Sequence, residues 1–280
     1  MMRIKFWGVR GSIPTPGADT SKIGGNTSCV EVQAGNTNII LDAGTGIRLL
    51  GNEILKRKAP FNAFMFFSHV HWDHIQGFPF FSPIFIKQNK LNIYGGKNLK
   101  MTLGDTLSGQ MNFPNFPITL DACSAQIKFH EFDDGQILNL AEGLTIKGLP
   151  LQHPNGCYGY RINYQGSSFT YCTDTEQGGD PDTPDKNVLE LAKETDLFVY
   201  DSQYTTDEYT GKSSGMPRIG WGHSTYAEAA RLAQLANVKK LIMFHHDPAH
   251  NDDKIYEMEK ECQKLFKSTE AAVEGREYIL

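Results

Sequence analysis

The chain has 280 residues, of which 40% are hydrophobic and 21% are charged, and its formal net charge is −5. This composition excludes a disordered or collagen-like chain and is sufficient for a large hydrophobic core. Lysine and arginine residues form no block that would attract nucleic acid in general. No apolar run approaches the roughly 18 residues of a membrane span. We therefore expect a globular protein that does not span a membrane.

The first residues and the cysteines bear on the compartment of the protein. Residues 1–17 are charged at Arg3 and Lys5 and turn to glycine and proline before a hydrophobic segment of secretory length develops. The five cysteines are scattered and form no CxxC pair, a pattern that is typical of reduced, buried thiols. Both features predict a cytoplasmic protein.

Taken in chain order, short β-rich runs alternate with amphipathic helical ones. The predicted strands lie at residues 3–8, 28–34, 37–44, 61–68, 90–95, 143–151, 158–164, 167–174, 196–202 and 240–245. The predicted helices lie at residues 45–57, 73–78, 97–108, 186–194, 224–236 and 252–267. Each half of the chain begins with strands and continues with mixed strands and helices. The pattern predicts one domain over residues 1–280, with two mixed sheets and helices on their outer faces.

The segment "FFSHVHWDH" at residues 66–74 holds three histidines and an aspartate within six positions. Further His and Asp residues directly follow predicted strands elsewhere in the chain. Because strand ends gather at one rim of a layered fold, we expect these side chains to converge. The seven candidate metal ligands are His69, His71, Asp73, His74, His153, Asp174 and His245.

The chemistry of these side chains fits two divalent metal ions. Imidazole binds zinc, manganese or iron, and a carboxylate can bridge a pair of ions. Asp174 would bridge the two ions. The expected sets are His69, His71 and His153 for one ion and Asp73, His74 and His245 for the other. Zinc is the favoured metal, with manganese and iron as alternatives.

Three stretches of the sequence resemble one protein family. "HVHWDH" at 69–74, followed by single His, Asp and His residues at wide spacing, resembles the metallo-β-lactamase superfamily. "LDAG" at 41–44 is similar to its first motif, whose aspartate, here Asp42, supports the metal site. "GHSTYAEAARLAQLANVKKLIMFHH" at 222–246 resembles the C-terminal block of ribonuclease Z and its cyclic phosphodiesterase relatives. The resemblance implies an αββα sandwich and an active-site role for His223.

Several residues keep more than one interpretation at this stage. The strand "LIMF" favours His245 as the last ligand and places His246 at the pocket wall or behind the ligands, although the two could exchange roles. Asp42 could merely cap a turn, and Asp201 is a further pocket candidate because it ends a strand. Trp72 stands where ribonuclease Z usually has a small residue, and no long glycine-rich arm for gripping tRNA is evident.

The favoured interpretation is a metal-dependent hydrolase, specifically a phosphodiesterase acting on a small cyclic phosphate or cyclic nucleotide. Two cations would lower the pKa of a bridging water and hold the diester for in-line attack by the hydroxide. Asp73 would also orient the hydroxide. His223 would donate a proton or a hydrogen bond to the phosphoryl or leaving oxygen.

Three other interpretations use the same residues. The first is a tRNA 3′-end endonuclease of the ribonuclease Z type, and the second is a hydrolase of a carboxylic ester, thioester or lactam. The third is a non-catalytic metal-binding sensor, which ought to have lost some of the seven ligands, yet all are present. A small phosphodiester is favoured over nucleic acid as the partner, and a homodimer is left open.

Overall fold

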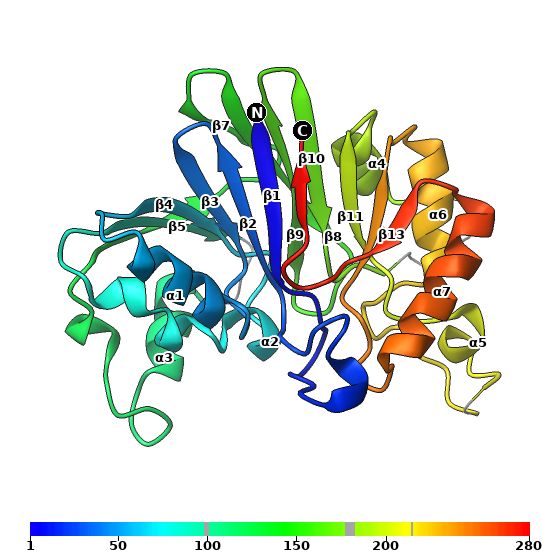
Figure 1. Ribbon diagram of the computed structural model, residues 1–280, viewed down its shortest axis with the longest axis horizontal. Coiled ribbons are helices and arrows are strands. Elements are labelled where there is room, and N and C mark those ends of the chain that lie inside the picture. The colour runs from blue at the N-terminus through cyan, green and yellow to red at the C-terminus, as the bar shows by residue number, and fades with distance from the viewer. Residues whose placement is uncertain (98–100, 177–182, 214) are drawn as a thin grey trace.

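The computed structural model describes residues 1–97, 101–176, 183–213 and 215–280. Two sheets face each other at the centre of the molecule, and helices cover their outer faces (Figure 1). The α/β sandwich expected from the sequence is therefore confirmed. Among the described residues, every helix is too short or too polar to traverse a membrane.

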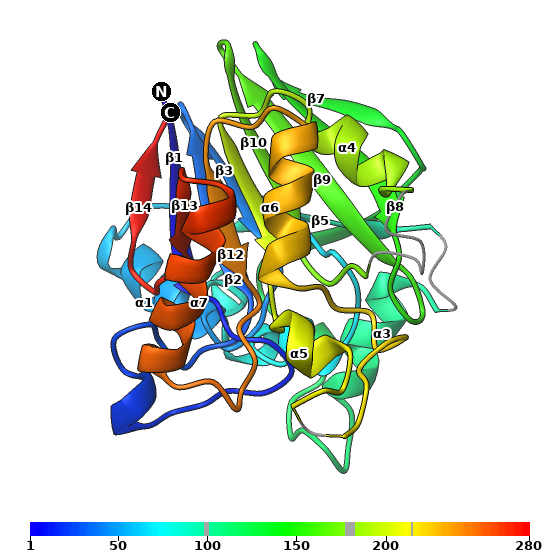
Figure 2. The ribbon, with the colours of Figure 1, turned by 90° about the vertical axis from the view of Figure 1, so that its right-hand side faces the viewer.

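The first sheet has the strand order β14-β1-β2-β3-β4-β5-β6. Strands β1 to β3 pair antiparallel, whereas β3 to β6 run parallel to one another. Its strands are β1 (Met2–Gly8), β2 (Cys29–Ala34), β3 (Thr37–Leu41), β4 (Asn62–Phe66), β5 (Lys90–Gly96), β6 (Gln126–Phe132) and β14 (Glu277–Ile279). Pairing of β14 with β1 brings the two ends of the chain side by side (Figures 1 and 2).

The second sheet has the strand order β13-β12-β11-β10-β9-β8-β7. Strands β7 to β10 pair antiparallel, and β10 to β13 run parallel. Its strands are β7 (Ile137–Ala141), β8 (Leu144–Leu151), β9 (Cys157–Tyr164), β10 (Ser167–Cys172), β11 (Leu197–Asp201), β12 (Leu241–Phe244) and β13 (Thr269–Ala271). Each sheet thus has an antiparallel half and a parallel half.

The helices form the two outer layers. Helices α1 and α3 lie on the side of the first sheet, and α4, α6 and α7 lie on the side of the second, as the two views at right angles show (Figures 1 and 2). The helices are α1 (Ile47–Lys56), α2 (Trp72–Ile75), α3 (Leu103–Gln110), α4 (Lys186–Ala192), α5 (Thr206–Tyr209), α6 (Tyr226–Leu235) and α7 (Asp252–Leu265). Side-chain caps begin several of them; for example, the Thr225 hydroxyl accepts the backbone N–H of Glu228 at the start of α6.

The central core forms between the sheets because alternate residues of each strand point inward. In β1, Ile4 and Phe6 are fully buried in this core. Phe66 of the first sheet contacts Tyr160 of the second, with ring centroids 5.4 Å apart. Burying one large apolar side chain of this kind stabilises the fold by about 1.5–3 kcal/mol.

Some elements differ from the expectation. Strands β6, β7, β13 and β14 were not expected, because two of them have only three residues and the other two expose most of their side chains. Helix α3 begins at Leu103 after its cap Thr102, later than expected, and residues 98–100 of that prediction lie outside the described residues. Strand β3 ends at Leu41 because Asp42 adopts a left-handed conformation with φ of 60°.

Parallel strands carry the candidate residues to one rim. Strands β3 and β4 of the first sheet are parallel neighbours, and so are β10, β11 and β12 of the second. Neighbouring parallel strands end at the same edge of their sheet. The residues that follow these five strands are Asp42, the segment 67–74, Asp174, the segment 202–203 and His245.

Candidate metal centre

The segment after β4 turns two side chains inward by starting a short helix. His71 is the extended N-cap of α2, and Asp73 and His74 are buried in its first turn. Gly77 allows the helix to sit close to the preceding motif, since a Cβ at this position would lie 2.0 Å from the carbonyl oxygen of Gly44. The backbone therefore fixes the segment before any metal is considered.

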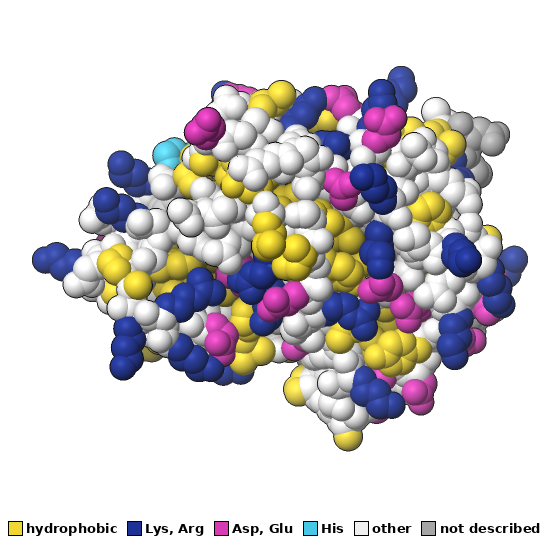
Figure 3. All heavy atoms as spheres, turned by 45° about the horizontal axis from the view of Figure 1, so that its top comes forward, with side chains coloured by type: hydrophobic (Ala, Val, Ile, Leu, Met, Phe, Trp, Pro, Cys, Tyr) yellow, Lys and Arg dark blue, Asp and Glu magenta, His cyan; other side chains and the backbone are white. Residues whose placement is uncertain are grey.

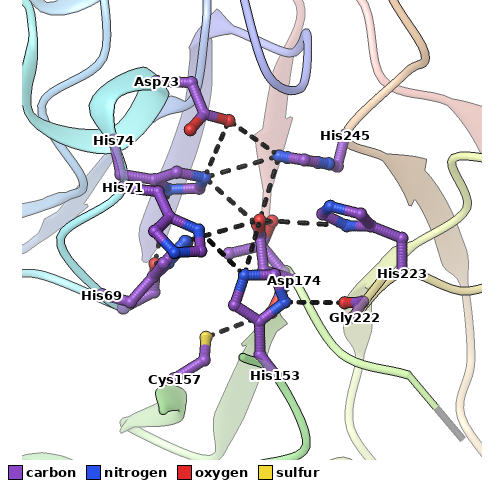
Figure 4. Close-up of polar contacts among 12 residues, drawn as sticks. His69, His71, Asp73, His74, His153, Cys157, Asp174, Gly222, His223 and His245 are labelled. Atoms are coloured by element: carbon purple, nitrogen blue, oxygen red, sulfur yellow. Dashed lines mark hydrogen bonds and ion pairs between the residues drawn. The ribbon is translucent and has the colours of Figure 1, made fainter. Parts of the chain in front are cut away.

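The first group of donors consists of three histidines. His69, His71 and His153 each offer a ring nitrogen, and these atoms lie within 4.8 Å of one another. His153 Nε2 is 3.0 Å from His71 Nδ1. Figure 4 shows the three rings turned toward a common centre.

The second group combines two carboxylates with two histidines. Asp73, His74, Asp174 and His245 bring one donor atom each within the same limit, and all four are buried. His245 Nε2 is 3.1 Å from Asp73 Oδ2 and 3.2 Å from Asp174 Oδ2. The structure thus brings all seven candidate ligands together.

Asp174 lies between the two groups, as Figure 4 shows. Its carboxylate is 3.2 Å from His74 Nε2 and 3.6 Å from His69 Nε2. Burial alone would raise the pKa of this carboxyl, but the surrounding imidazoles, His245 first, hold it well below its usual range. Asp174 and His245 both have positive φ, 48° and 61°, a strained conformation that clusters at functional sites.

The donor set fits metal ions by two observations. The buried Nε2 of His69 has no hydrogen-bond partner among the described residues, although burying such an atom unpaired is unfavourable. Burial also lowers the pKa of His69 and His71, and it lowers the pKa of His153 to about 4. These three imidazoles are therefore neutral near pH 7, the state that binds metal.

Oxygen acceptors fix the orientation of several ligand rings. His74 Nδ1 donates to Asp42 at 2.9 Å, and His245 Nδ1 donates to the side-chain oxygen of Gln203 at 2.9 Å. His153 Nδ1 donates to the Gly222 carbonyl at 2.8 Å. In each ring this leaves Nε2 directed at the centre, which is the usual arrangement behind metal-binding histidines.

The carboxylate of Asp42 is the central acceptor of a buried hydrogen-bond network. In addition to His74, its carboxylate accepts the backbone N–H of Ser68 at 2.7 Å, the Ser68 hydroxyl at 2.8 Å and the Tyr171 hydroxyl at 2.8 Å. Tyr171 belongs to the second sheet, so the network spans the sandwich. Asp42 thus lies directly behind the candidate ligand His74.

His223 lies beside the ligands with a carboxylate behind it. Its Nδ1 is 2.8 Å from Asp201 Oδ2, and its side chain is 12% exposed. Burial opposes protonation, but the Asp201 carboxylate outweighs it and raises the pKa of His223 to about 9. His223 also belongs to two further groups of possible donor atoms that lie within 4.8 Å of one another, one with His153 and Asp174 and one with Asp201 and His245.

Glu176 holds the segment that carries His223. Its carboxylate accepts the backbone N–H groups of Gly220 and Gly222, each at 2.7 Å, and the hydroxyl of Tyr209 at 2.5 Å. Gly222 has φ of 86°, and a Cβ there would lie 2.3 Å from His153 Nδ1. Glu176 therefore orders the same short stretch that orients His153.

The two remaining candidates are His246 and Trp72. His246 does not join the cluster: its Nε2 donates to the Ala272 carbonyl at 3.0 Å, away from His245, because consecutive side chains point in different directions. Trp72 is exposed at the opening of a cavity of about 600 Å³. The residues that line this cavity are Ser12, Val70, His71, Trp72, Asp73, Asp174 and His223.

The comparison with known protein families decides the family. Residues 37–246 match the family described as the beta-lactamase superfamily domain. The chain belongs to the metallo-β-lactamase superfamily. The match covers the segments from β3 to His246, which hold all seven candidate ligands.

Relatives within the superfamily agree with the expected branch. Ribonuclease BN of Cronobacter sakazakii is 26% identical, over 74% of this chain and 78% of the relative. Ribonuclease Z of Prochlorococcus marinus is 23% identical, over 97% of each protein. A solved structure described as a diphosphatase of the PhnP family has a TM-score of 0.72 at 17% identity and covers 100% of this chain and 98% of that one. The ribonuclease Z-like branch and a metal-dependent hydrolase are therefore confirmed.

Sequence reasoning missed three supporting residues of this metallo-β-lactamase site. Ser68 directly precedes His69 within the motif, so its position was a usable signal. Gln203 follows Asp201 by two residues, a weaker signal of the same kind. Glu176 follows Asp174 by two residues, but its role had no sequence signal, because its partners are backbone N–H groups 44 and 46 residues further along the chain.

Proposed function

We propose that the protein is a dinuclear phosphodiesterase that hydrolyses a small cyclic phosphate or cyclic nucleotide. The observation that carries this proposal is the placement of two donor groups around Asp174, with His223 lining the same cavity. One group would hold its ion through neutral nitrogens, and the other through a mixed set of oxygens and nitrogens. Zinc suits both sets, and manganese or iron would also be accepted.

The bound ions would supply Lewis acidity toward the phosphoryl oxygens and a water of lowered pKa. The protein supplies position and proton transfer. Asp73 is fixed by the backbone N–H of Ser12, which donates to its Oδ2 at 2.7 Å. From this position the carboxylate can accept a hydrogen bond from the attacking water and orient it toward phosphorus.

His223 acts on the departing oxygen. Because its Nδ1 is engaged by Asp201, its Nε2 is the atom that can donate to a substrate in the cavity. A pKa raised to about 9 keeps the proton on this imidazole at neutral pH. A protonated imidazole is suited to stabilise the negative charge that develops on a poor leaving group.

The size of the site and the scattered charge on another face of the molecule support a small diester. A cavity of about 600 Å³ lies within the roughly 300–1,000 Å³ typical of small-molecule sites. The face of the molecule in Figure 3 is not the one that carries the site, and on it Lys and Arg side chains are scattered with acidic side chains between them. This distribution differs from the continuous basic stripe that attracts a nucleic-acid backbone.

The relatives named ribonuclease Z and ribonuclease BN support a second candidate, cleavage of an RNA phosphodiester. Both candidates use the same chemistry at phosphorus and differ in the size of the substrate. The neighbour described as a diphosphatase supports phosphate chemistry on this fold. A carboxylic ester, thioester or lactam would need the same centre to act on a carbonyl carbon.

A panel of substrates tests the proposal on the metal-loaded enzyme. The panel contains a bis-aryl phosphate, 2′,3′- and 3′,5′-cyclic nucleotides, acyl substrates and a precursor tRNA with a 3′ trailer. We expect kcat/KM to be highest for a small phosphodiester. Efficient trimming of the tRNA without turnover of any small cyclic phosphate would favour the ribonuclease over the small-molecule phosphodiesterase. Turnover of acyl substrates alone would contradict both of these functions.

A further inference from the structure

Trp72 is the most exposed large apolar side chain at the opening of the catalytic cavity. Its side chain is 80% exposed, yet it lines the same cavity as His71, Asp73 and His223. An isolated exposed tryptophan is unusual, because an indole gains more from burial than most side chains. Its position next to the donor groups calls for an explanation.

The local fold does not require a tryptophan at this position. Trp72 is the first residue of α2, a position that tolerates most residue types. Within the described ranges, its indole has neither a hydrogen-bond partner nor a partner ring. The helix is held by other groups: the Gln76 amide donates to the Thr27 hydroxyl at 3.3 Å, and Gly77 packs on Gly44.

The backbone of Trp72 is nevertheless held next to the candidate metal centre. Trp72 lies between His71 and Asp73, so its Cα is one virtual bond of about 3.8 Å from the Cα of each. Both neighbours belong to the donor groups that would fix the phosphate. Because Trp72 lines the same cavity, a flat group attached to that phosphate would lie within reach of the indole.

The other residues of the cavity limit which kind of chemical group could lie against the indole. Its described lining residues include no Lys or Arg. The part of a substrate beyond the phosphate would therefore contact no positively charged side chain there. The apolar surface of the cavity comes from the side chains of Trp72 and Val70. An aromatic ring has enough area and the right shape to stack on one exposed indole, whereas a short aliphatic chain does not.

We propose that Trp72 is a stacking platform for the nucleobase of the substrate. This inference rests on the proposed phosphodiesterase function and names its substrate class as nucleoside cyclic phosphates. The relatives named ribonucleases act on substrates that carry bases. Stacking of one base on an aromatic side chain changes affinity by about 5- to 150-fold.

Two cyclic phosphates with the same reacting ring test the platform. Adenosine 2′,3′-cyclic phosphate carries a base, and glycerol 1,2-cyclic phosphate does not. For Trp72→Ala we expect kcat/KM on the adenosine substrate to fall about 5- to 150-fold, mainly through KM, because stacking lies outside the reacting bonds. The value on the glycerol substrate should stay within about twofold. Trp72→Phe, which keeps a ring, should recover most of the loss.

Phe113→Ala is the matched control variant. Phe113 is 90% exposed and is not among the residues that line the cavity. Its removal should leave the ratio of the two kcat/KM values unchanged. An equal ratio in the wild type and in Trp72→Ala would overturn the stacking inference, while activity on both substrates would still support the proposed function.

A binding measurement separates the two claims when no turnover is found. AMP should quench tryptophan emission of the metal-loaded protein, whereas ribose 5-phosphate, which has no base, should not. In Trp72→Phe the quenching by AMP should disappear, although calorimetry should still detect AMP binding. Quenching that persists in Trp72→Phe would assign the signal to Trp7 or Trp221 and overturn the inference. If no small cyclic phosphate of the substrate panel were turned over, the proposed function would be overturned, and the quenching result alone would test the role of Trp72.

Discussion

At the residue scale, the account assigns His223 the role of a proton donor and not that of an additional metal ligand. A ligand's removal should empty a metal site, whereas a donor's removal should leave the ions bound and slow the reaction. We expect His223→Ala to keep its full metal content and to lose roughly 10²- to 10⁴-fold in kcat on a diester with a poor leaving group. The loss should be smaller on a nitrophenyl diester, whose leaving oxygen needs little help from an acid.

Steady-state kinetics on the two diesters, together with elemental analysis, check this prediction. Asp201→Asn is the companion variant, because it weakens the contact that holds the proton on His223 while keeping the shape of the side chain. Its loss should follow the same dependence on the leaving group but be smaller. Loss of a metal ion from His223→Ala would make it a ligand, and wild-type rates on both diesters would remove it from the mechanism.

At the element scale, the stretch between α5 and α6 reaches the centre because Glu176 holds it. In Glu176→Gln an amide N–H₂ replaces one acceptor oxygen and faces a backbone N–H group of Gly220 or Gly222. We expect the free energy of unfolding to fall by about 1–3 kcal/mol, the cost of leaving a buried donor unpaired. Because His223 would lose its position, kcat on the poor-leaving-group diester should fall more than on the nitrophenyl diester.

Denaturant unfolding and the same pair of diesters measure both effects. Glu190→Gln is the control, since Glu190 has a 55% exposed side chain and pairs with Lys147 at the surface. Exposed pairs contribute little, so its unfolding free energy should change by less than about 0.5 kcal/mol. Equal losses on both diesters in Glu176→Gln would mean that Glu176 supports stability only.

The elements that the sequence predicted are those with a strong local pattern. Strands β4 and β12 are apolar runs that end in motif residues, so their positions and their direction toward the site could be read directly. Strand β14 is three residues long and pairs with β1 across almost the whole chain, a contact for which local patterning holds no information. In the site, the ligand types were visible in the motifs. The hydrogen bonds from Gly220 and Gly222 to Glu176 could not be predicted, because they depend on how segments distant in the sequence meet in the fold.

At the scale of the whole molecule, Arg10 joins the two sheets near the rim. This fully buried side chain follows β1 of the first sheet and donates to the carbonyl oxygens of Asp247 and His250, which follow β12 of the second, and to Gly24. Burial lowers the pKa of Arg10, and Asp252 opposes this shift. Arg10→Met keeps the apolar stem and leaves these carbonyls without their donor. We expect the free energy of unfolding to fall by about 3 kcal/mol.

Unfolding in urea checks the contribution of Arg10. Arg48→Met is the matched control, because Arg48 is exposed on α1 and the chemical change is the same. Its unfolding free energy should change by less than about 0.5 kcal/mol. A similar loss in both variants would show that the interior contacts of Arg10 contribute no more than a surface charge.

The central claim is that ligands from both sheets hold two ions around Asp174. Elemental analysis of the purified protein, compared with His69→Ala and Asp174→Ala, tests it most directly. The account predicts about two transition-metal ions per chain in the wild type, and the loss of at least one ion and nearly all activity in either variant. A wild-type protein that binds no metal, or one ion that neither substitution removes, would contradict it.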